Sequence, residues 1–235
     1  MSAIERKFNN RAELIDCVHG VFVESLQQAL ELHSSATMLL SGGSTPAPLY
    51  RQLSSADLDW NRVHVALVDE RWVEISNAAS NERLLNQNLL LEKAAAAKFT
   101  GMKNNHPTPF EGEAECNARY AALPSPYTIC LLGMGPDGHT ASLFPGAEGL
   151  GSALDSSQHC AGIRAVRSEV TGDYLERMTM TPWSILQSQR LVLLITGEDK
   201  WAVYQQARDN SPTADRPISL MIHQQQTPLE VYWAA

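Results

Sequence analysis

Apolar residues in the first part of the chain recur at helical spacing and then gather in short, unbroken runs. Between Arg11 and Leu32 they fall three or four positions apart, which predicts a helix with one buried face. The run ATMLL at 36–40 is apolar throughout and ends in the polar segment SGGSTP. RVHVALVD at 62–69 then predicts a strand, and SNERLLNQNLLLEK at 80–93 predicts a helix that begins near a Ser or Asn cap. Strands and helices therefore alternate.

The alternation continues to the end of the sequence. Segment 111–123 predicts a helix, 127–133 a strand, 190–197 a strand and 198–208 a helix, and 217–224 and 229–235 predict a last helix and strand. The runs TICLL and LVLLI are apolar continuously, which suits strands that are covered on both faces. We therefore predict an α/β fold, with an open, mainly parallel sheet covered by helices on both faces. Residues 1–235 are predicted to form a single domain.

The connecting segments carry turn residues. HPTPF (106–110) and LPSPY (123–127) predict proline turns, and GAEGLGSALDSSQ (146–158) predicts a loop rich in glycine and serine. Four alanines at 94–97 predict a short helical stretch.

Composition narrows the classes of function. The 235 residues are 44% hydrophobic, which is enough for a sizeable core, and the net charge of −8 argues against a nucleic-acid or anionic membrane surface. The four cysteines are scattered without metal-ligand spacing, so we expect buried thiols and no metal. The polar start MSAIERKFNN lacks the apolar core of a secretory signal, and no apolar run approaches the roughly 20 residues of a membrane span. We expect a cytoplasmic protein.

Ligands of open α/β sheets bind beyond the carboxyl ends of the strands, so we expect the site residues in the segments that follow the apolar runs. In SGGSTPAP (41–48), Gly42 and Gly43 permit a tight turn, Ser44 and Thr45 offer hydroxyls, and the next helix offers unpaired N–H groups. This combination suits a phosphate, although no Walker motif is present. The alternative is a turn and helix cap, with Pro46 at the first helical position.

VDERWV places charged residues directly after a strand. Asp69 can orient a group or exchange protons, and Arg71 can neutralise an oxyanion or phosphate. The alternative is a solvated run of charges with an Asp–Arg pair.

The segment LLGMGPDGHTASLFPG (131–146) matches GxGxxG, but a dinucleotide loop would open a long helix and have an acidic residue after the next strand. FPG arrives within six residues of His139, and Asp155 lies in a polar stretch with no strand before it. We therefore interpret the glycines as a sharp turn that presents Asp137 and His139 for proton transfer. The alternative is a structural histidine that caps the TASLF turn.

Two further segments offer positive charge. RMTMT (177–181) supplies Arg177, and TGEDK (196–200) places Lys200 about one turn into a helix after a strand. Each of these side chains could equally be surface charge. With SGGST, however, Arg177 and Lys200 supply the positive charge and hydrogen-bond donors that an acidic protein needs to hold one phosphate.

Together, SGGSTP (41–46), DERWV (69–73), GMGPDGHTASLFPG (133–146), RMTMT and GEDK (197–200) resemble the 6-phosphogluconolactonase family, from about residue 11 to the C-terminus. This family belongs to a larger group with glucosamine-6-phosphate deaminase, ribose-5-phosphate isomerase and CoA transferases. The resemblance implies the fold of that group and a cytoplasmic, monomeric hydrolase of 6-phospho-D-glucono-1,5-lactone in the oxidative pentose phosphate pathway. It implies a small-molecule sugar-phosphate lactone as partner and no metal or organic cofactor.

On this hypothesis the SGGST loop, Arg177 and Lys200 hold the 6-phosphate, and His139 takes a proton from the attacking water and returns it to the ring oxygen. Asp137 orients His139 or faces a substrate hydroxyl. Arg71 stabilises the carbonyl oxygen, and Asp69 holds Arg71 or contacts the sugar. No serine nucleophile is needed, and the GxSxG motif is absent.

Two other functions are compatible with parts of this pattern. Glucosamine-6-phosphate deaminases share the Asp-Gly-His sequence but have a glutamate seven residues after the aspartate, where this chain has Phe144. A non-catalytic sugar-phosphate sensor should bring a helix-turn-helix module and a basic surface, whereas this sequence starts almost directly with its first predicted helix.

Overall fold

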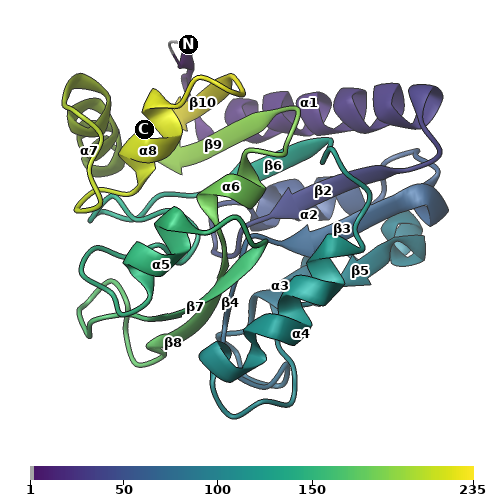
Figure 1. Cartoon of the computed structure of the whole chain (residues 1–235). Helices are drawn as coiled ribbons and strands as arrows, with labels where there is room; N and C mark the ends of the chain where they lie inside the picture. Colours follow the sequence, from purple (N-terminus) through teal and green to yellow (C-terminus); the bar gives the residue numbers. More distant parts are fainter. Residues whose placement is uncertain (1–2) are drawn as a thin grey trace.

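The computed structural model describes residues 3–235, which form a seven-stranded and a three-stranded sheet (Figure 1). The large sheet has the order β1-β10-β9-β6-β2-β3-β5, and all of its neighbouring strands run parallel. These strands are β1 (Ile4–Phe8), β2 (Ala36–Leu40), β3 (Val63–Leu67), β5 (Lys98–Thr100), β6 (Ile129–Leu132), β9 (Leu191–Thr196) and β10 (Leu229–Ala234). The predicted mainly parallel α/β sheet is confirmed.

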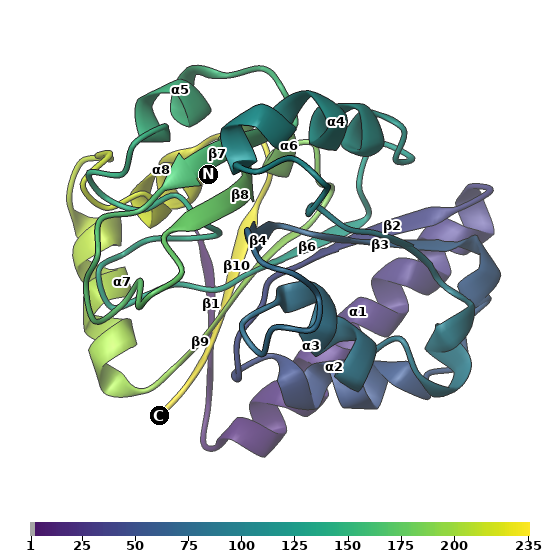
Figure 2. The same cartoon turned by 90° about the horizontal axis from the view of Figure 1, so that it is seen from below.

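Helices cover both faces of the large sheet, as predicted. Figure 2 shows α1, α2 and α3 on one side, and α4 to α8 with the small sheet on the other. The helices are α1 (Arg11–Leu32), α2 (Ala47–Ser54), α3 (Asn81–Asn88), α4 (Pro109–Ala121), α5 (Leu150–Asp155), α6 (Pro182–Ile185), α7 (Glu198–Asp209) and α8 (Ile218–His223). Among the helices in residues 3–235, none is long and apolar enough to cross a membrane.

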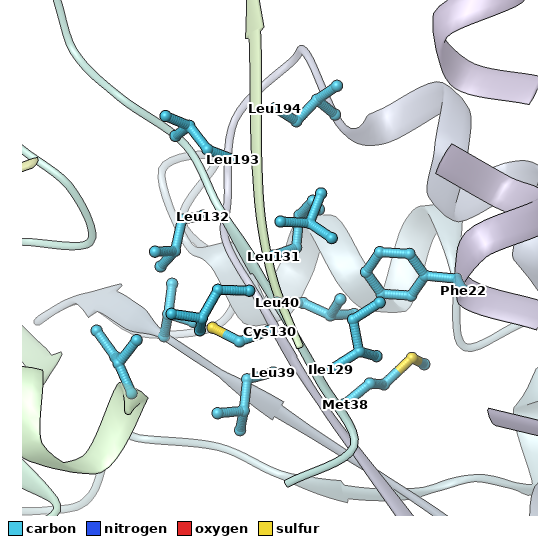
Figure 3. Packing of buried hydrophobic residues seen from close by; sticks show 14 of the residues in the cluster. Phe22, Met38, Leu39, Leu40, Ile129, Cys130, Leu131, Leu132, Leu193 and Leu194 are labelled. Atoms are coloured by element: carbon cyan, nitrogen blue, oxygen red, sulfur yellow. The ribbon is translucent and has the colours of Figure 1, made fainter. Parts of the chain in front are cut away.

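The central strands are apolar on both faces, which is why their sequences show no alternation. In Figure 3, Ile129 and Leu131 lie on the side of Phe22 from α1, whereas Cys130 and Leu132 lie on the opposite side. All five side chains are fully buried. Successive residues of a strand point to opposite faces, so a strand between two helical layers must be apolar at every position.

The small sheet was not predicted. It consists of β4 (Asp69–Arg71), β8 (Glu176–Met180) and β7 (Cys160–Arg164), which pair antiparallel. The segments DERWV and RMTMT, expected to be strand-end loops, therefore pair with each other. Met180 N donates to Val68 O, which joins this sheet to the strand-end of β3.

Four other elements differ from the prediction. The segment 146–158, predicted to be a loop, contains α5, whose Leu150 and Ala153 are buried in a second, small apolar cluster. The exposed strand β1, which pairs with β10 at one sheet edge, and strand β5 at the other edge were not predicted. The helix predicted at 80–93 ends at Asn88 as α3. The alanine stretch lies largely in a 3₁₀ helix (Glu92–Ala96), so the predicted short helical stretch is confirmed.

Candidate active site

The parallel strands β2, β6 and β9 are neighbours, so the segments that follow them meet at one edge of the large sheet. These segments and the small sheet enclose a cavity of about 290 Å³. Nine of the ten residues singled out in the sequence line it: Gly42, Gly43, Ser44, Thr45, Asp69, Arg71, His139, Arg177 and Lys200. The tenth, Asp137, does not line the cavity and instead contacts His139.

The glycine-rich loop after β2 turns tightly into α2. Gly43 has a φ of +102°, a conformation that favours glycine. Tyr50 of α2 donates to the carbonyl of Ser41, which ties the loop to the helix that follows it. Pro46 precedes α2, and no side chain caps the helix. The N–H groups of its first turn are therefore available to an anion.

His139 lies at the end of a compact turn after β6. Gly138 N donates to Gly135 O and Gly135 N to His139 O, and Gly138 has a φ of +79°. A Cβ at Gly135 would collide with the His139 ring. The glycines thus permit a sharp turn, and no helix is described between Gly138 and Leu150, as expected for a loop that is not of the dinucleotide-binding type.

Asp137 fixes the orientation of the His139 ring. Its Oδ1 lies 2.5 Å from His139 Nδ1 and also accepts from the His139 backbone N–H at 3.2 Å. Burial opposes ionisation of Asp137, but these hydrogen bonds outweigh it and lower the pKa of the carboxyl. Because Nδ1 is engaged by Asp137, Nε2 is the ring nitrogen left for the cavity. The ring of Phe144 packs against the imidazole, with the centroids 4.2 Å apart.

Asp69 does not pair with Arg71, so the expectation that it holds this arginine is wrong, as is the alternative of a solvated Asp–Arg pair. Asp69 is 7% exposed, and its Oδ2 accepts from Ser142 Oγ at 2.6 Å. Its Oδ1 and backbone carbonyl both accept from Asn81 Nδ2, at 3.3 and 2.8 Å. Arg71 has a different partner, because its Nη1 donates to the backbone carbonyl of Ala79.

Arg71 and Arg177 are direct cross-strand neighbours on β4 and β8. Within residues 3–235, neither makes an ion pair with a carboxylate, and Arg71 Nε is buried without a hydrogen-bond partner. Like charges opposite each other destabilise a sheet, so this arrangement favours the binding of negative charge in the cavity that both side chains line. Burial and the charge of Arg71 lower the pKa of Arg177 to about 10.

Arg177 is buried, which excludes the alternative that it is surface charge. Its Nε donates to Tyr174 O at 2.6 Å and its Nη2 to Thr171 O at 3.1 Å. The guanidinium also lies over the Phe144 ring, 5.5 Å from its centroid. Arg177 therefore holds segment 171–174 beside the cavity. Lys200, the third residue of α7, is half-buried, and burial lowers its pKa.

The sequence analysis missed three residues that support the site. Asn81 and Ser142 hold Asp69, and Glu70 accepts from the backbone N–H groups of Asn81 and Glu82, both at 2.8 Å. Burial raises the pKa of Glu70 to about 7, although its four hydrogen-bond donors lower it. Ser142 lies within the TASLF segment, and Asn81 was interpreted only as part of a helix cap. No local pattern would have connected either with Asp69.

The arrangement combines a proton acceptor with positive charge. An imidazole whose Nδ1 is held by a carboxylate can take a proton from water at Nε2. Two arginines and a lysine can bind a phosphate and stabilise an oxyanion. No group of three or more His, Cys, Asp or Glu side chains in residues 3–235 is placed to hold a metal ion.

Comparisons with known proteins agree with this geometry. The family model described as glucosamine-6-phosphate isomerases/6-phosphogluconolactonase matches residues 9–233. A 6-phosphogluconolactonase of Rhizobium meliloti (strain 1021) is 38% identical over 234 residues, which cover 100% of both chains. The crystal structure of a 6-phosphogluconolactonase from Shewanella baltica OS155 has a TM-score of 0.95 and 34% identity, covering 99% of this chain and 98% of that one.

A monomeric glucosamine-6-phosphate deaminase has the same fold, with a TM-score of 0.76 and 19% identity over 98% of this chain and 97% of that one. The family model matches nearly the whole chain, and the similarity to the Rhizobium enzyme extends over the full length of both chains. The chain belongs to the glucosamine-6-phosphate isomerase/6-phosphogluconolactonase family.

Proposed function

We propose that the protein hydrolyses 6-phospho-D-glucono-1,5-lactone to 6-phospho-D-gluconate, in the oxidative pentose phosphate pathway. The observation that carries this proposal is the Asp137–His139 pair, 2.5 Å apart, whose imidazole faces a cavity with three cationic side chains. The names of the similar proteins from Rhizobium meliloti and Shewanella baltica support the choice of substrate.

The phosphate binds at the loop after β2. Gly42, Gly43, Ser44 and Thr45 offer backbone N–H groups and hydroxyls, and Arg177 and Lys200 supply the positive charge. The net charge of −8 gives the molecule no general attraction for anions, so this local cluster must provide it. Binding of the phosphate places the lactone carbonyl near His139, and such positioning can supply much of the rate enhancement.

His139 acts first as a base and then as an acid. Nε2 takes a proton from water as the water oxygen bonds to C1, and the carbonyl electrons move onto the carbonyl oxygen. Arg71, whose side chain lines the cavity, stabilises that negative charge. When the carbonyl re-forms, the bond between C1 and the ring oxygen breaks, and the ring oxygen takes the proton from Nε2. Asp69 contacts a sugar hydroxyl.

Phe144 favours the lactonase over a deaminase. Its ring packs on one face of His139 and lies beneath the Arg177 guanidinium, where a deaminase of this family is expected to have a glutamate. No carboxylate at this position is therefore available to assist ring opening.

The proposed substrate is tested with freshly generated 6-phosphogluconolactone, by following 6-phosphogluconate formation above the spontaneous rate. A parallel assay measures ammonia release from glucosamine 6-phosphate. We expect turnover in the first assay only. Ammonia release without lactone hydrolysis would contradict the proposal.

Replacing Lys200 with alanine tests the phosphate site. We expect KM to rise about 10-fold, because a hydrogen bond to a charged group contributes about 1.5–3 kcal/mol, while kcat stays within about twofold. Lys98→Ala, at an exposed position on β5, is the control and should leave both constants unchanged. An unchanged KM in Lys200→Ala would remove this residue from the phosphate site.

We also propose that the protein is a cytoplasmic monomer. All four cysteines are free, which suits a reducing compartment. Light scattering during size-exclusion chromatography should give the mass of one 25.8 kDa chain, and twice that mass would contradict the monomer.

A further inference from the structure

We propose that Asn81 is a positioning residue that fixes Asp69 relative to the phosphate loop, residues 41–45. This inference rests on the proposed lactonase function, because it assigns Asp69 and the loop to opposite parts of one substrate. Asn81 lines the cavity and is 2% exposed.

The amide of Asn81 fixes the Asp69 side chain. Nδ2 donates both to the Asp69 backbone carbonyl and to Oδ1, and Ser142 donates to the other carboxylate oxygen. Donors on both oxygens, from α3 and from the segment after His139, leave the carboxylate little freedom to rotate. Asp69 is thereby held in one orientation at the cavity wall before any substrate binds.

The same amide contacts the phosphate loop. A Cβ on Gly42 would collide with Oδ1 of Asn81, and the nearest atoms to that position all belong to Asn81. Gly42 does not have the left-handed backbone conformation that Gly43 has, so the turn itself does not demand glycine there. Gly42 is therefore required because the amide of Asn81 lies against it. One side chain thus touches the loop through Oδ1 and Asp69 through Nδ2.

The backbone of Asn81 is held by the buried Glu70. The Glu70 carboxylate accepts from Asn81 N, Glu82 N and Ser80 Oγ, at 2.8, 2.8 and 3.0 Å. Ser80 also caps α3 through Arg83 N. The first turn of α3 is consequently fixed to β4, and Asn81 cannot follow the loop if the loop moves.

In this way Asn81 sets the distance between Asp69, which contacts the sugar, and the phosphate loop, residues 41–45. A misplacement of about 1 Å can cost about 100-fold in rate, so loss of Asn81 should act mainly on kcat. KM should change less, because the phosphate contacts of the loop, Arg177 and Lys200 remain.

Asn81→Asp gives a pH signature that a purely structural role would not give. The charged groups around this position are Asp69, Glu70 and Arg71 of β4 and Glu82 of α3, and Arg177 of β8 acts on both β4 carboxylates. The neighbouring carboxylates should raise the pKa of the introduced carboxyl. When protonated it can donate to Asp69 as the amide does, and when ionised it repels Asp69.

We therefore expect kcat of Asn81→Asp, divided by that of the wild type at the same pH, to rise about tenfold or more from pH 7.5 to pH 5.0. Taking the ratio removes the titration of groups that both proteins share. Asn86→Asp, the same change at an exposed position of α3, is the control and should give a ratio near one throughout. A ratio for Asn81→Asp that does not change with pH would overturn the proposal.

A double-mutant cycle tests the contact with the loop independently, even if Asn81→Asp does not fold. Gly42→Ala should lower kcat about 100-fold in the wild type but less than about twofold in Asn81→Ala, because the obstacle is then gone. Equal losses in both backgrounds would contradict the proposal. If the wild type does not hydrolyse the lactone, the proposed function fails; if it does and the cycle is additive, only the role of Asn81 fails.

Discussion

Replacing His139 with alanine lowers kcat for the lactone about 1,000-fold while affinity for 6-phosphogluconate stays within about threefold. A positioned general acid–base contributes about 100- to 10,000-fold, and here one residue serves both proton transfers. Product affinity is retained because the proposed phosphate contacts come from other residues that line the cavity, on the loop after β2, on β8 and on α7. The measurements are steady-state kinetics corrected for spontaneous hydrolysis and calorimetric titration with 6-phosphogluconate.

Two controls accompany this variant. His33→Ala removes an exposed imidazole at the end of α1 and should leave turnover unchanged. Asp137→Asn should itself lower kcat but should cause little further loss when combined with His139→Ala, because residues that act as one unit are not additive. Near-wild-type turnover in His139→Ala would refute its role as the base.

Replacing Arg177 with lysine raises KM about 100-fold and lowers the melting temperature. Arginine uses Nε and Nη2 to hold the carbonyls of Tyr174 and Thr171 and presents its remaining donors to the cavity. Lysine keeps the charge but cannot hold two carbonyls and a phosphate oxygen in one plane. Loss of charge-assisted hydrogen bonds of about 1.5–3 kcal/mol each accounts for an effect of this size.

The matched control is Arg164→Lys, in the same small sheet. Arg164 binds Glu148 and Glu176 at the surface, both at 3.0 Å, and such exposed pairs contribute about 0–1 kcal/mol. We expect no change in KM and at most a small change in melting temperature. An Arg177→Lys variant whose KM matches that of Arg164→Lys would remove Arg177 from the phosphate site.

The local sequence was sufficient to predict five strands of the seven-stranded sheet, β2, β3, β6, β9 and β10, but not the edge strands β1 and β5. Strands β2, β6 and β9 are short apolar runs that are followed by polar or glycine-containing residues. Their continuous hydrophobicity follows from burial on both faces. Because ligands of such sheets bind beyond the carboxyl ends of parallel strands, the sequence also predicted that SGGST, His139 and Lys200 would meet.

The small sheet depends on pairing between distant segments. Strand β4 has only three residues, and its partner β8 begins at Glu176, more than one hundred positions later in the chain. A run of three charged residues carries no periodicity that could distinguish a strand from a loop. Only the pairing shows that Arg71 lies opposite Arg177, so that two charges far apart in the sequence line the same cavity.

The partners of Asp69 were equally inaccessible to local reasoning. The nearest opposite charge in the sequence, Arg71, was the natural choice, but the folded chain brings Asn81 and Ser142 closer. By itself, the sequence determined the alternation of strands and helices and the sharp glycine turn that presents Asp137 and His139, because both depend on neighbouring residues. The tertiary structure alone decided which side chains hold Asp69, Arg177 and the phosphate loop, because these contacts join segments that the sequence separates and only packing brings together.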